Sequence, residues 1–357
     1  MSIALKVNKL REILDDKELD AILVSSPPNR RYLSGFTGSA GYLLISRSES
    51  VLCTDFRYLE QAREQAPDFR LERMSALMDW FPRLASELGV KNIGIEADDI
   101  TVSTRLTLQK AIDRSDVNSD ILLVETSHLV DMLRGVKYQD ELKLLNQAIQ
   151  ITDQAFEEVS CQITSGIRES EIAWSLEKAM RERGAEALAF DIIVGAGSNA
   201  ALPHHRADDT VISNGQSVVI DMGAQFEGYC ADLTRTVFVG QPDEKFRHIY
   251  DIVLGAQRVA IDGVKVGMTG GDLDQMAREF ISEAGYGDNF GHSLGHGVGL
   301  VVHEFPRVGP NSTDLIGEGM VFTIEPGIYL SGWGGVRIED IVLVKDGIAE
   351  VISKANK

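Results

Sequence analysis

The most informative part of the sequence is the stretch SVVIDMGAQFEGYCADLTRTVFVG, residues 217–240. Two apolar runs flank the polar segment Gln-Phe-Glu-Gly, which predicts a β-hairpin. With the turn centred between Phe226 and Glu227, Asp221 and Asp232 lie opposite each other, with Cβ atoms about 5 Å apart. Two carboxylates this close among Val, Ile and Phe side chains destabilise a fold unless a cation lies between them. The hairpin therefore predicts a divalent metal, whose preferred ligands are carboxylate oxygens.

A second hairpin is predicted in the stretch GMVFTIEPGIYLSGWGGVRIEDIVLV, residues 319–344. Glu325 and Glu339 are equidistant from a turn at Gly332, so they form a second pair of opposed carboxylates on apolar strands. A bulge at Pro326-Gly327 or Gly334-Gly335 would shift this register. One such pair fits a solvent-exposed face equally well, but two pairs favour a metal site.

Histidines are concentrated between and before these hairpins. Five of the seven lie within about 100 residues, and for any one of them a polar loop beside a cleft is an equally good explanation. The stretch GHSLGHGVGLVVHEFP (291–306) is too rich in glycine for an ordinary helix, although His292 and His296 are four residues apart. Its part VGLVVHE predicts a strand that delivers His303. One imidazole and four carboxylates suit two divalent metals roughly 3.5–4 Å apart.

Length and charge narrow the class of protein. The chain has 357 residues, which predicts two domains, and its formal net charge of −19 disfavours binding to nucleic acid or to anionic membranes. No apolar run reaches the ~18 residues of a membrane helix, and no signal peptide is recognised. Three widely spaced cysteines form no disulfide framework. A cytoplasmic protein is expected.

The pattern of elements changes near residue 128. Strands alternate with helices over residues 1–128, which predicts a small α/β domain. Residues 129–357 begin with two long helical stretches and continue as a glycine-rich, β-rich region with two more helices, and no Pro/Gly/Ser linker separates the two parts. The predicted helical stretches of this second domain are 138–161, 169–184, 243–262 and 271–285.

Several segments resemble those of a known family. In four segments the chain resembles the proline-specific metallopeptidases aminopeptidase P and prolidase, which belong to the creatinase and methionine aminopeptidase superfamily. The segments match in order and spacing, and they are IDMGAQFEGYCADLTRT, HSLGHGVGLVVHEFP, IEPGIY and GGVRIED. The segment FDIIVGAGSNAALPHH (190–205) is similar to the one that supplies a substrate-site histidine. RRYLSGFTGSAGYLLI and TDFRYLEQA are similar to the creatinase-type N-terminal domain. The resemblance spans nearly the whole chain.

The resemblance implies a fold and a metal site. The expected fold class is α/β, with a small N-terminal creatinase-like domain and a C-terminal pita-bread domain, assembled as a homodimer. Asp221 would chelate one metal, His296 and Glu325 would bind the second, and Asp232 and Glu339 would bridge both. Mn²⁺ is the expected metal, with Co²⁺ or Zn²⁺ as alternatives.

The resemblance also assigns substrate-site residues. His292 and His303 would line the scissile region, and His204 would be the third such histidine, with His205 as the alternative alignment. Arg337, two residues before Glu339, would orient that ligand or contact substrate.

The function expected from this site is an Xaa-Pro aminopeptidase that acts on short peptides. Two metals lower the pKa of a bridging water, the resulting hydroxide attacks the carbonyl before proline, and Glu325 carries the proton towards the leaving nitrogen. The alternative is an Xaa-Pro dipeptidase (prolidase), but FTGSAG and TDFRYLEQA look closer to aminopeptidase P.

More distant alternatives remain open. These are a metal-free creatinase-like amidinohydrolase, a methionine aminopeptidase, which needs no N-terminal domain, and a non-enzymatic homologue on the same scaffold, which typically has lost ligands.

Overall fold

The computed structural model describes residues 2–75, 77–116 and 120–357. The chain divides into two compact units, Met1–Arg134 and Gly135–Lys357, and the helix α6 (Leu129–Gly135) spans this division. The sequence places the boundary after residue 128, at the start of that helix. Each unit is described by itself below.

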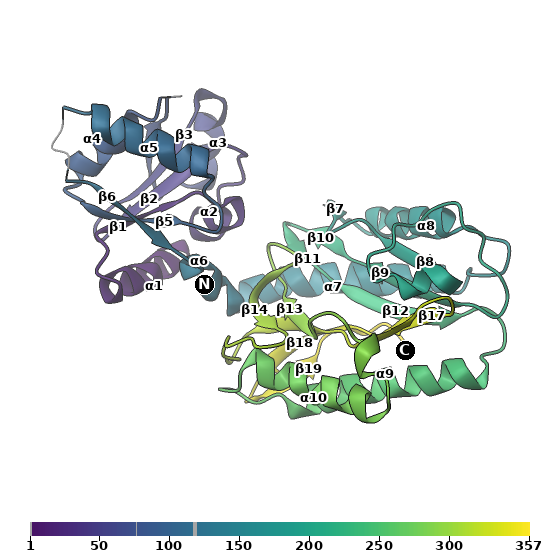
Figure 1. The fold of residues 1–357 in the computed structure, drawn as a ribbon. Coiled ribbons are helices and arrows are strands. Elements are labelled where there is room, and N and C mark those ends of the chain that lie inside the picture. Colours follow the sequence, from purple (N-terminus) through teal and green to yellow (C-terminus); the bar gives the residue numbers. More distant parts are fainter. Residues whose placement is uncertain (1, 76, 117–119) are drawn as a thin grey trace. The chain divides into compact units, whose positions relative to one another are not determined.

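The first unit is built on a six-stranded mixed sheet with the strand order β4-β3-β2-β1-β5-β6 (Figure 1). Strands β1, β2 and β3 are antiparallel neighbours, and β4, β5 and β6 are added in parallel. The strands are β1 (Ala21–Val24), β2 (Tyr42–Ser46), β3 (Ser50–Thr54), β4 (Arg70–Arg73), β5 (Asn92–Glu96) and β6 (Leu122–Thr126). The helices are α1 (Ile3–Asp16), α2 (Pro27–Ser34), α3 (Leu59–Gln65), α4 (Trp80–Glu87) and α5 (Val102–Arg114), with a 3₁₀ turn, η1 (Phe56–Tyr58).

The alternation expected for this unit is present, because its strands carry the apolar runs that the sheet buries. All four residues of β1 are buried, and Phe81 and Leu84 of α4 pack on the same core. The helix α2 begins with Pro27 and Pro28. Proline is tolerated in the first turn of a helix because its missing N–H would have no helical partner.

The first half of the second unit packs two helices on a three-stranded sheet. Phe156 of α7 and Leu176 of α8 are buried in one hydrophobic core with Val194 of β8 and Ile220 of β9. The sheet has the order β12-β9-β8, beside a smaller sheet β11-β10-β7. The elements are α7 (Gln139–Ser160), α8 (Glu169–Glu182), β7 (Ala187–Leu188), β8 (Ile193–Ala196), η2 (Gly197–Ala201), β9 (Ser217–Met222), β10 (Ala224–Phe226), β11 (Tyr229–Cys230) and β12 (Leu233–Phe238).

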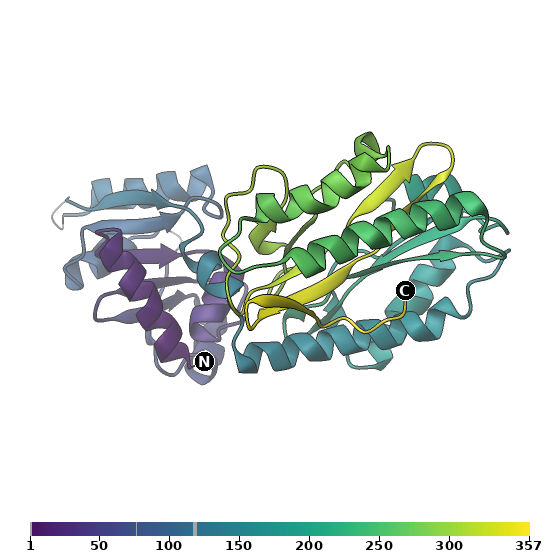
Figure 2. The same cartoon turned by 90° about the horizontal axis from the view of Figure 1, so that it is seen from below.

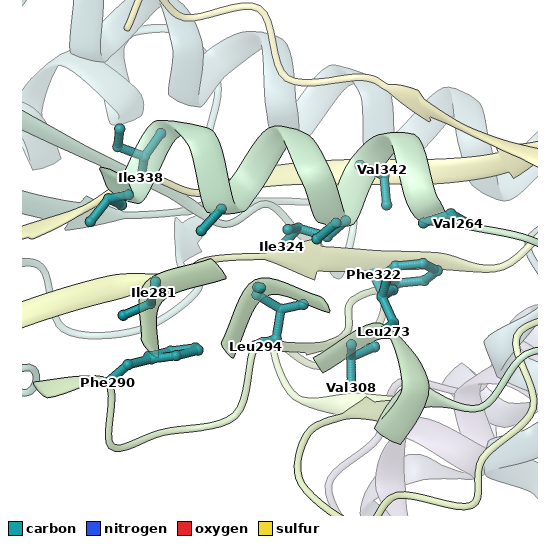
Figure 3. Close-up of a cluster of buried hydrophobic side chains, with 14 of the residues drawn as sticks. Val264, Leu273, Ile281, Phe290, Leu294, Val308, Phe322, Ile324, Ile338 and Val342 are labelled. Carbon is teal, nitrogen blue, oxygen red and sulfur yellow. The ribbon is translucent and has the colours of Figure 1, made fainter. Parts of the chain in front are cut away.

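The second half repeats this arrangement with a five-stranded sheet, β14-β13-β15-β18-β19. Helices α9 and α10 lie side by side along it in both ribbon views (Figures 1 and 2). Figure 3 shows Phe322 and Ile324 of β15 in the same hydrophobic core as Leu273 and Ile281 of α10. The elements are α9 (Glu244–Gly263), α10 (Gly270–Glu283), η3 (Gly287–Asn289), β13 (Gly295–Gly297), β14 (Glu304–Val308), β15 (Val321–Ile324), β16 (Gly327–Leu330), β17 (Gly334–Arg337), β18 (Asp340–Lys345) and β19 (Ile348–Val351). The four predicted helical stretches correspond to α7–α10.

The register of the first hairpin differs from the prediction. Asp221 pairs with Thr234, not with Asp232, because the turn residues are Glu227 and Gly228. Both have positive φ (43° and 78°), as a two-residue type I′ turn requires. Asp232 lies in the break between β11 and β12.

The register of the second hairpin is confirmed. Gly327 pairs with Arg337 and Ile324 with Asp340, so Glu325 and Glu339 occupy opposed positions with no bulge between them.

The strand predicted over VGLVVHE is wrong. Residues 298–303 are outside any strand, because they connect β13 to its antiparallel neighbour β14, which begins at Glu304. Among the helices that the structure describes, none is long and apolar enough to cross a membrane.

Candidate metal centre

The predicted ligands come together where the two halves of the second unit meet. Ligand atoms of Asp232, His296 and Glu339 all lie within 4.8 Å of one another. His296 Nε2 is 3.6 Å from Asp232 Oδ2 and 3.3 Å from Glu325 Oε1. Asp221 points from β9 into the same group, where its charge acts on Asp232 and Glu339. Five residues that are distant in the sequence therefore form one cluster.

The carboxylates of this cluster are buried and repel one another. Asp232 is 5% exposed and Glu339 is 1% exposed. Burial, followed by repulsion from Glu339, raises the pKa of Asp232 well above its ordinary value. Burial and the charge of Glu325 do the same to the pKa of Glu339. A divalent cation would remove both penalties, because its charge stabilises the ionised carboxylates.

Two further features fit a metal. Asp221 Oδ1 is buried and has no hydrogen-bond partner among the described residues. His296 holds its Nδ1 at 3.1 Å from the carbonyl oxygen of Gly297, which leaves Nε2 directed at the carboxylates. A backbone carbonyl on one ring nitrogen commonly sets the tautomer of a metal-binding histidine. The donor set of one imidazole and four carboxylates suits divalent ions.

Glu325 differs from the other carboxylates of the group. Burial alone would raise its pKa, but the contact with His296 Nε2 outweighs this and lowers the pKa of Glu325. Thr323 Oγ1 also donates to Glu325 Oε1 at 3.2 Å. Glu325 is thereby held as an ionised carboxylate beside the imidazole.

Arg337 is hydrogen-bonded to one of the predicted ligands, Asp221, and to Thr234. Its Nη2 donates to Asp221 Oδ2 at 2.7 Å, and its Nε donates to Thr234 Oγ1 at 3.0 Å. Thr234 in turn donates from Oγ1 to Glu339 Oε2 at 2.7 Å. Arg337 therefore contacts one ligand directly and a second through Thr234. Thr234 was not predicted, although its place two residues after Asp232 on an apolar run is a signal for it.

The tautomer of His292 follows from its partners. Arg337 Nη1 donates to the Tyr329 hydroxyl at 2.9 Å, and this hydroxyl is 2.9 Å from His292 Nε2. The Ser293 carbonyl oxygen, 2.8 Å from His292 Nδ1, can only accept, so Nδ1 carries the ring proton. In the neutral ring, Nε2 then accepts from the Tyr329 hydroxyl. Burial lowers the pKa of His292, which agrees with a neutral ring. Tyr329 was not predicted either.

His303 and His204 are the accessible histidines of this region. Both are exposed, and the ring of His303 lies 4.3 Å from that of His296, centroid to centroid. Burial lowers the pKa of His303, and the positive charges of His296 and His204 add to this effect. The charge of His204 also lowers the pKa of His292, so His204 is within electrostatic range of both rings. His205 instead lies 2.7 Å from Glu169 Oε2 through its Nε2.

Comparisons with known proteins agree with this geometry. The family model for Metallopeptidase family M24 matches residues 143–346, and that for the Creatinase/Prolidase N-terminal domain matches residues 6–136. The chain belongs to metallopeptidase family M24. The predicted α/β fold, with a creatinase-type N-terminal domain and a pita-bread C-terminal domain, is confirmed, as is the prediction of a hydrolase.

Particular relatives cover almost the whole chain. An Xaa-Pro dipeptidase of Pyrococcus horikoshii is 38% identical over 99% of this chain and 97% of its own length. The solved structure of an Xaa-Pro dipeptidase from Bacillus anthracis is 42% identical, with a TM-score of 0.94, and covers 100% of this chain and 99% of that one. An X-Pro aminopeptidase structure from Thermotoga maritima is 39% identical, with a TM-score of 0.88, and covers 98% of both chains.

Proposed function

We propose that this protein is an Xaa-Pro dipeptidase that hydrolyses the bond before proline with two divalent metal ions. The observation that carries the proposal is the group of Asp232, His296 and Glu339, within 4.8 Å and with both carboxylates buried, beside the exposed His204 and His303. Such a donor set next to accessible imidazoles is suited to metal-assisted hydrolysis. The proline-dipeptide substrate is supported by the names of the relatives.

The dipeptidase is preferred to the aminopeptidase that the sequence favours. Two sequence relatives at 38% identity, from Pyrococcus horikoshii and Pyrococcus furiosus, are named Xaa-Pro dipeptidase. The Thermotoga maritima structure is named X-Pro aminopeptidase, which supports the aminopeptidase as the second candidate function. Both enzymes cleave the same kind of bond and differ in whether a residue may follow the proline.

The five predicted ligands would hold the metals: Asp221, Asp232, His296, Glu325 and Glu339. When bound, the ions supply a water of lowered pKa and polarise the substrate carbonyl. We propose Mn²⁺, with Co²⁺ or Zn²⁺ as alternatives, because the set is rich in oxygen and has one imidazole. The five side chains lie on separate strands and breaks between strands, so the fold positions them before any ion binds.

The remaining residues act on substrate and protons. Glu325 is held ionised beside His296, so its Oε1 can take a proton and pass it to the leaving nitrogen of proline. His303 and His204 are accessible donors for the oxygen of the scissile carbonyl. Neutral His292, fixed by Tyr329, lines the same region. Arg337 uses its three nitrogens on Asp221, Tyr329, Pro203 and Thr234, which favours orientation of ligands over contact with substrate.

The proposal is tested by comparing two substrates. The Mn²⁺-loaded protein is incubated with Ala-Pro and with Ala-Pro-Ala, with a chelator-treated sample as the control. Cleavage of Ala-Pro alone is the expected result. Cleavage of Ala-Pro-Ala at its Ala-Pro bond would instead establish the aminopeptidase. Failure to cut either peptide with two metals bound would overturn the proposal. A homodimer is part of the proposal, and light scattering after gel filtration measures it.

A further inference from the structure

Glu169, at the start of α8, is a buried carboxylate with four hydrogen-bond donors. Its side chain is fully buried. Oε1 accepts from the backbone N–H of Ala196 at 2.8 Å and from Asn199 Nδ2 at 3.0 Å. Oε2 faces His205 Nε2 at 2.7 Å and accepts from the backbone N–H of Asp208 at 3.4 Å. All four donors belong to one segment, residues 196–210, named here the His204 loop.

The first turn of α8 holds the far end of the same loop. The backbone N–H of Glu169 donates to the carbonyl of Thr210 at 3.1 Å, and that of Ser170 donates to the carbonyl of Asp208 at 3.0 Å. Asn199 Nδ2 also donates to Thr210 Oγ1 at 3.2 Å, which ties the two ends of the loop together. Glu169 is thus at the centre of the contacts that close the loop.

The opposite side of the loop lies against the metal centre. The carbonyl oxygen of Pro203 accepts from Arg337 Nη1 at 3.2 Å. The carbonyl oxygen of Ala200 would be 2.1 Å from a Cβ placed on Gly335, so β17 approaches the loop as closely as glycine allows. The loop is therefore held between Glu169 on one side and Arg337 on the other.

His204 and His205 point to different sides of this loop. His205 is directed inward to Glu169 with its side chain 11% exposed, whereas His204 is exposed beside His292 and His303. An ionised carboxylate can only accept, so His205 Nε2 carries the ring proton. This contact and the one between the Pro203 carbonyl and Arg337 hold the chain on both sides of His204.

We propose that Glu169 and His205 are positioning residues that act on the reaction through His204. This inference rests on the proposed function, in which His204 contacts the substrate. A side chain misplaced by about 1 Å can cost about 100-fold in rate, so a loop held at several points has a direct effect on turnover.

The test is a double-mutant cycle with a matched control. We expect His205→Ala to lower kcat/KM for Ala-Pro by about 10-fold or more, with two metals still bound. His205→Gln places an N–H close to the original Nε2 and is expected to recover most of this loss. In a His204→Ala background, His205→Ala is expected to add less than about a 2-fold change, because it acts through His204. Glu169→Gln tests the other partner. Glu182→Gln is the control, since Glu182 is exposed in the last turn of the same helix.

Each other outcome has a defined meaning. An equal loss for His205→Ala with and without His204 would show that the pair serves stability alone and would overturn the inference. Unchanged activity in His205→Ala, or in His204→Ala, would overturn it as well and leave the proposed function intact. Absence of hydrolysis by the metal-loaded wild type would overturn both. ¹⁵N NMR of the histidine rings is the readout without activity: a protected Nε2–H of His205 is expected in the wild type and lost in Glu169→Gln.

Discussion

Arg337 donates from Nη2 to Oδ2 of Asp221 at 2.7 Å, although the two residues are 116 positions apart in the chain. Asp221 lies on β9 and Arg337 on β17, in the two halves of the catalytic unit. The pair is almost fully removed from water, with side chains 14% and 3% exposed. One guanidinium therefore fixes a ligand of the first half from a strand of the second.

The first prediction concerns this pair. Arg337→Met removes the donor to Asp221 and to Thr234, so both ligand-bearing strands lose an orienting contact. We expect the affinity for Mn²⁺ to fall by about 10- to 100-fold, the range typical of residues that orient ligands. Titration calorimetry on the metal-free protein measures this affinity. Arg258→Met, at an exposed arginine on α9, is the control and should leave the affinity unchanged.

A second prediction concerns the linkage between metal and stability. Metal that binds only the folded chain at 100 times its Kd should raise the free energy of unfolding by about 2.7 kcal/mol. Asp232→Asn and His296→Ala remove ligands, so we expect both to fold, to lose hydrolysis, and to gain little stability from Mn²⁺. Thermal unfolding with and without a chelator measures the gain. Asp262→Asn, at an exposed position on α9, should behave as the wild type; wild-type-like activity in either ligand variant would contradict the metal assignment.

The third prediction concerns the close approach of β13 to β15. A Cβ on Gly295 would be 1.9 Å from the carbonyl oxygen of Thr323, so the backbone has to move. We expect Gly295→Ala to destabilise the protein by about 1–3 kcal/mol and to lower activity, because it displaces the adjacent ligand His296. Gly291→Ala is the matched control, since its Cβ would meet nothing within 4 Å. Equal unfolding midpoints in urea for the two variants would argue against this packing.

A fourth prediction concerns the buried ion pair between Lys137 and Glu304. Nζ and Oε1 are 2.6 Å apart, and both side chains are 1% exposed. Glu304 directly follows His303, so the pair also anchors the segment that carries this histidine. Lys137→Met leaves a buried carboxylate without its cation and should cost about 3–5 kcal/mol of stability.

The exposed pair of Lys345 and Glu350, at 3.4 Å, is the comparison for this experiment. Lys345→Met should cost at most about 1 kcal/mol, because water solvates both charges and screens their attraction. Urea unfolding of the two variants gives both values. A similar small loss in Lys137→Met would mean that burial of the pair has no energetic consequence.

Local turn chemistry explains why one hairpin was predicted and the other was not. Gly332 has φ of +76° in a turn where glycine is favoured, and the positions equidistant from it, Glu325 and Glu339, are opposed as expected. In the first hairpin the prediction centred the turn one residue too early. Gly228 occupies the second turn position, where a positive φ is required, and the pattern Glu-Gly was the available signal.

Contacts between distant residues could not be read from the chain in this way. The sequence around His204 and His205 does not show which of the two contacts a buried carboxylate. That carboxylate belongs to Glu169, which is 36 residues from His205. The apolar residues at 298–303 predict a strand, but this segment is the loop that connects the antiparallel strands β13 and β14. Thr234 and Tyr329 are recognised only in the tertiary structure, where both accept hydrogen bonds from Arg337.

The sequence by itself determined which chemistry this protein can hold. Four carboxylates and an imidazole within or beside apolar runs indicate a cation site, and the alternation of helices and strands predicts an α/β fold, because these follow from side-chain type and local period. The tertiary structure alone decided which side chains meet. The partner of Asp221, the tautomer of His292 and the contact of His205 with Glu169 depend on hydrogen bonds between residues brought together by packing.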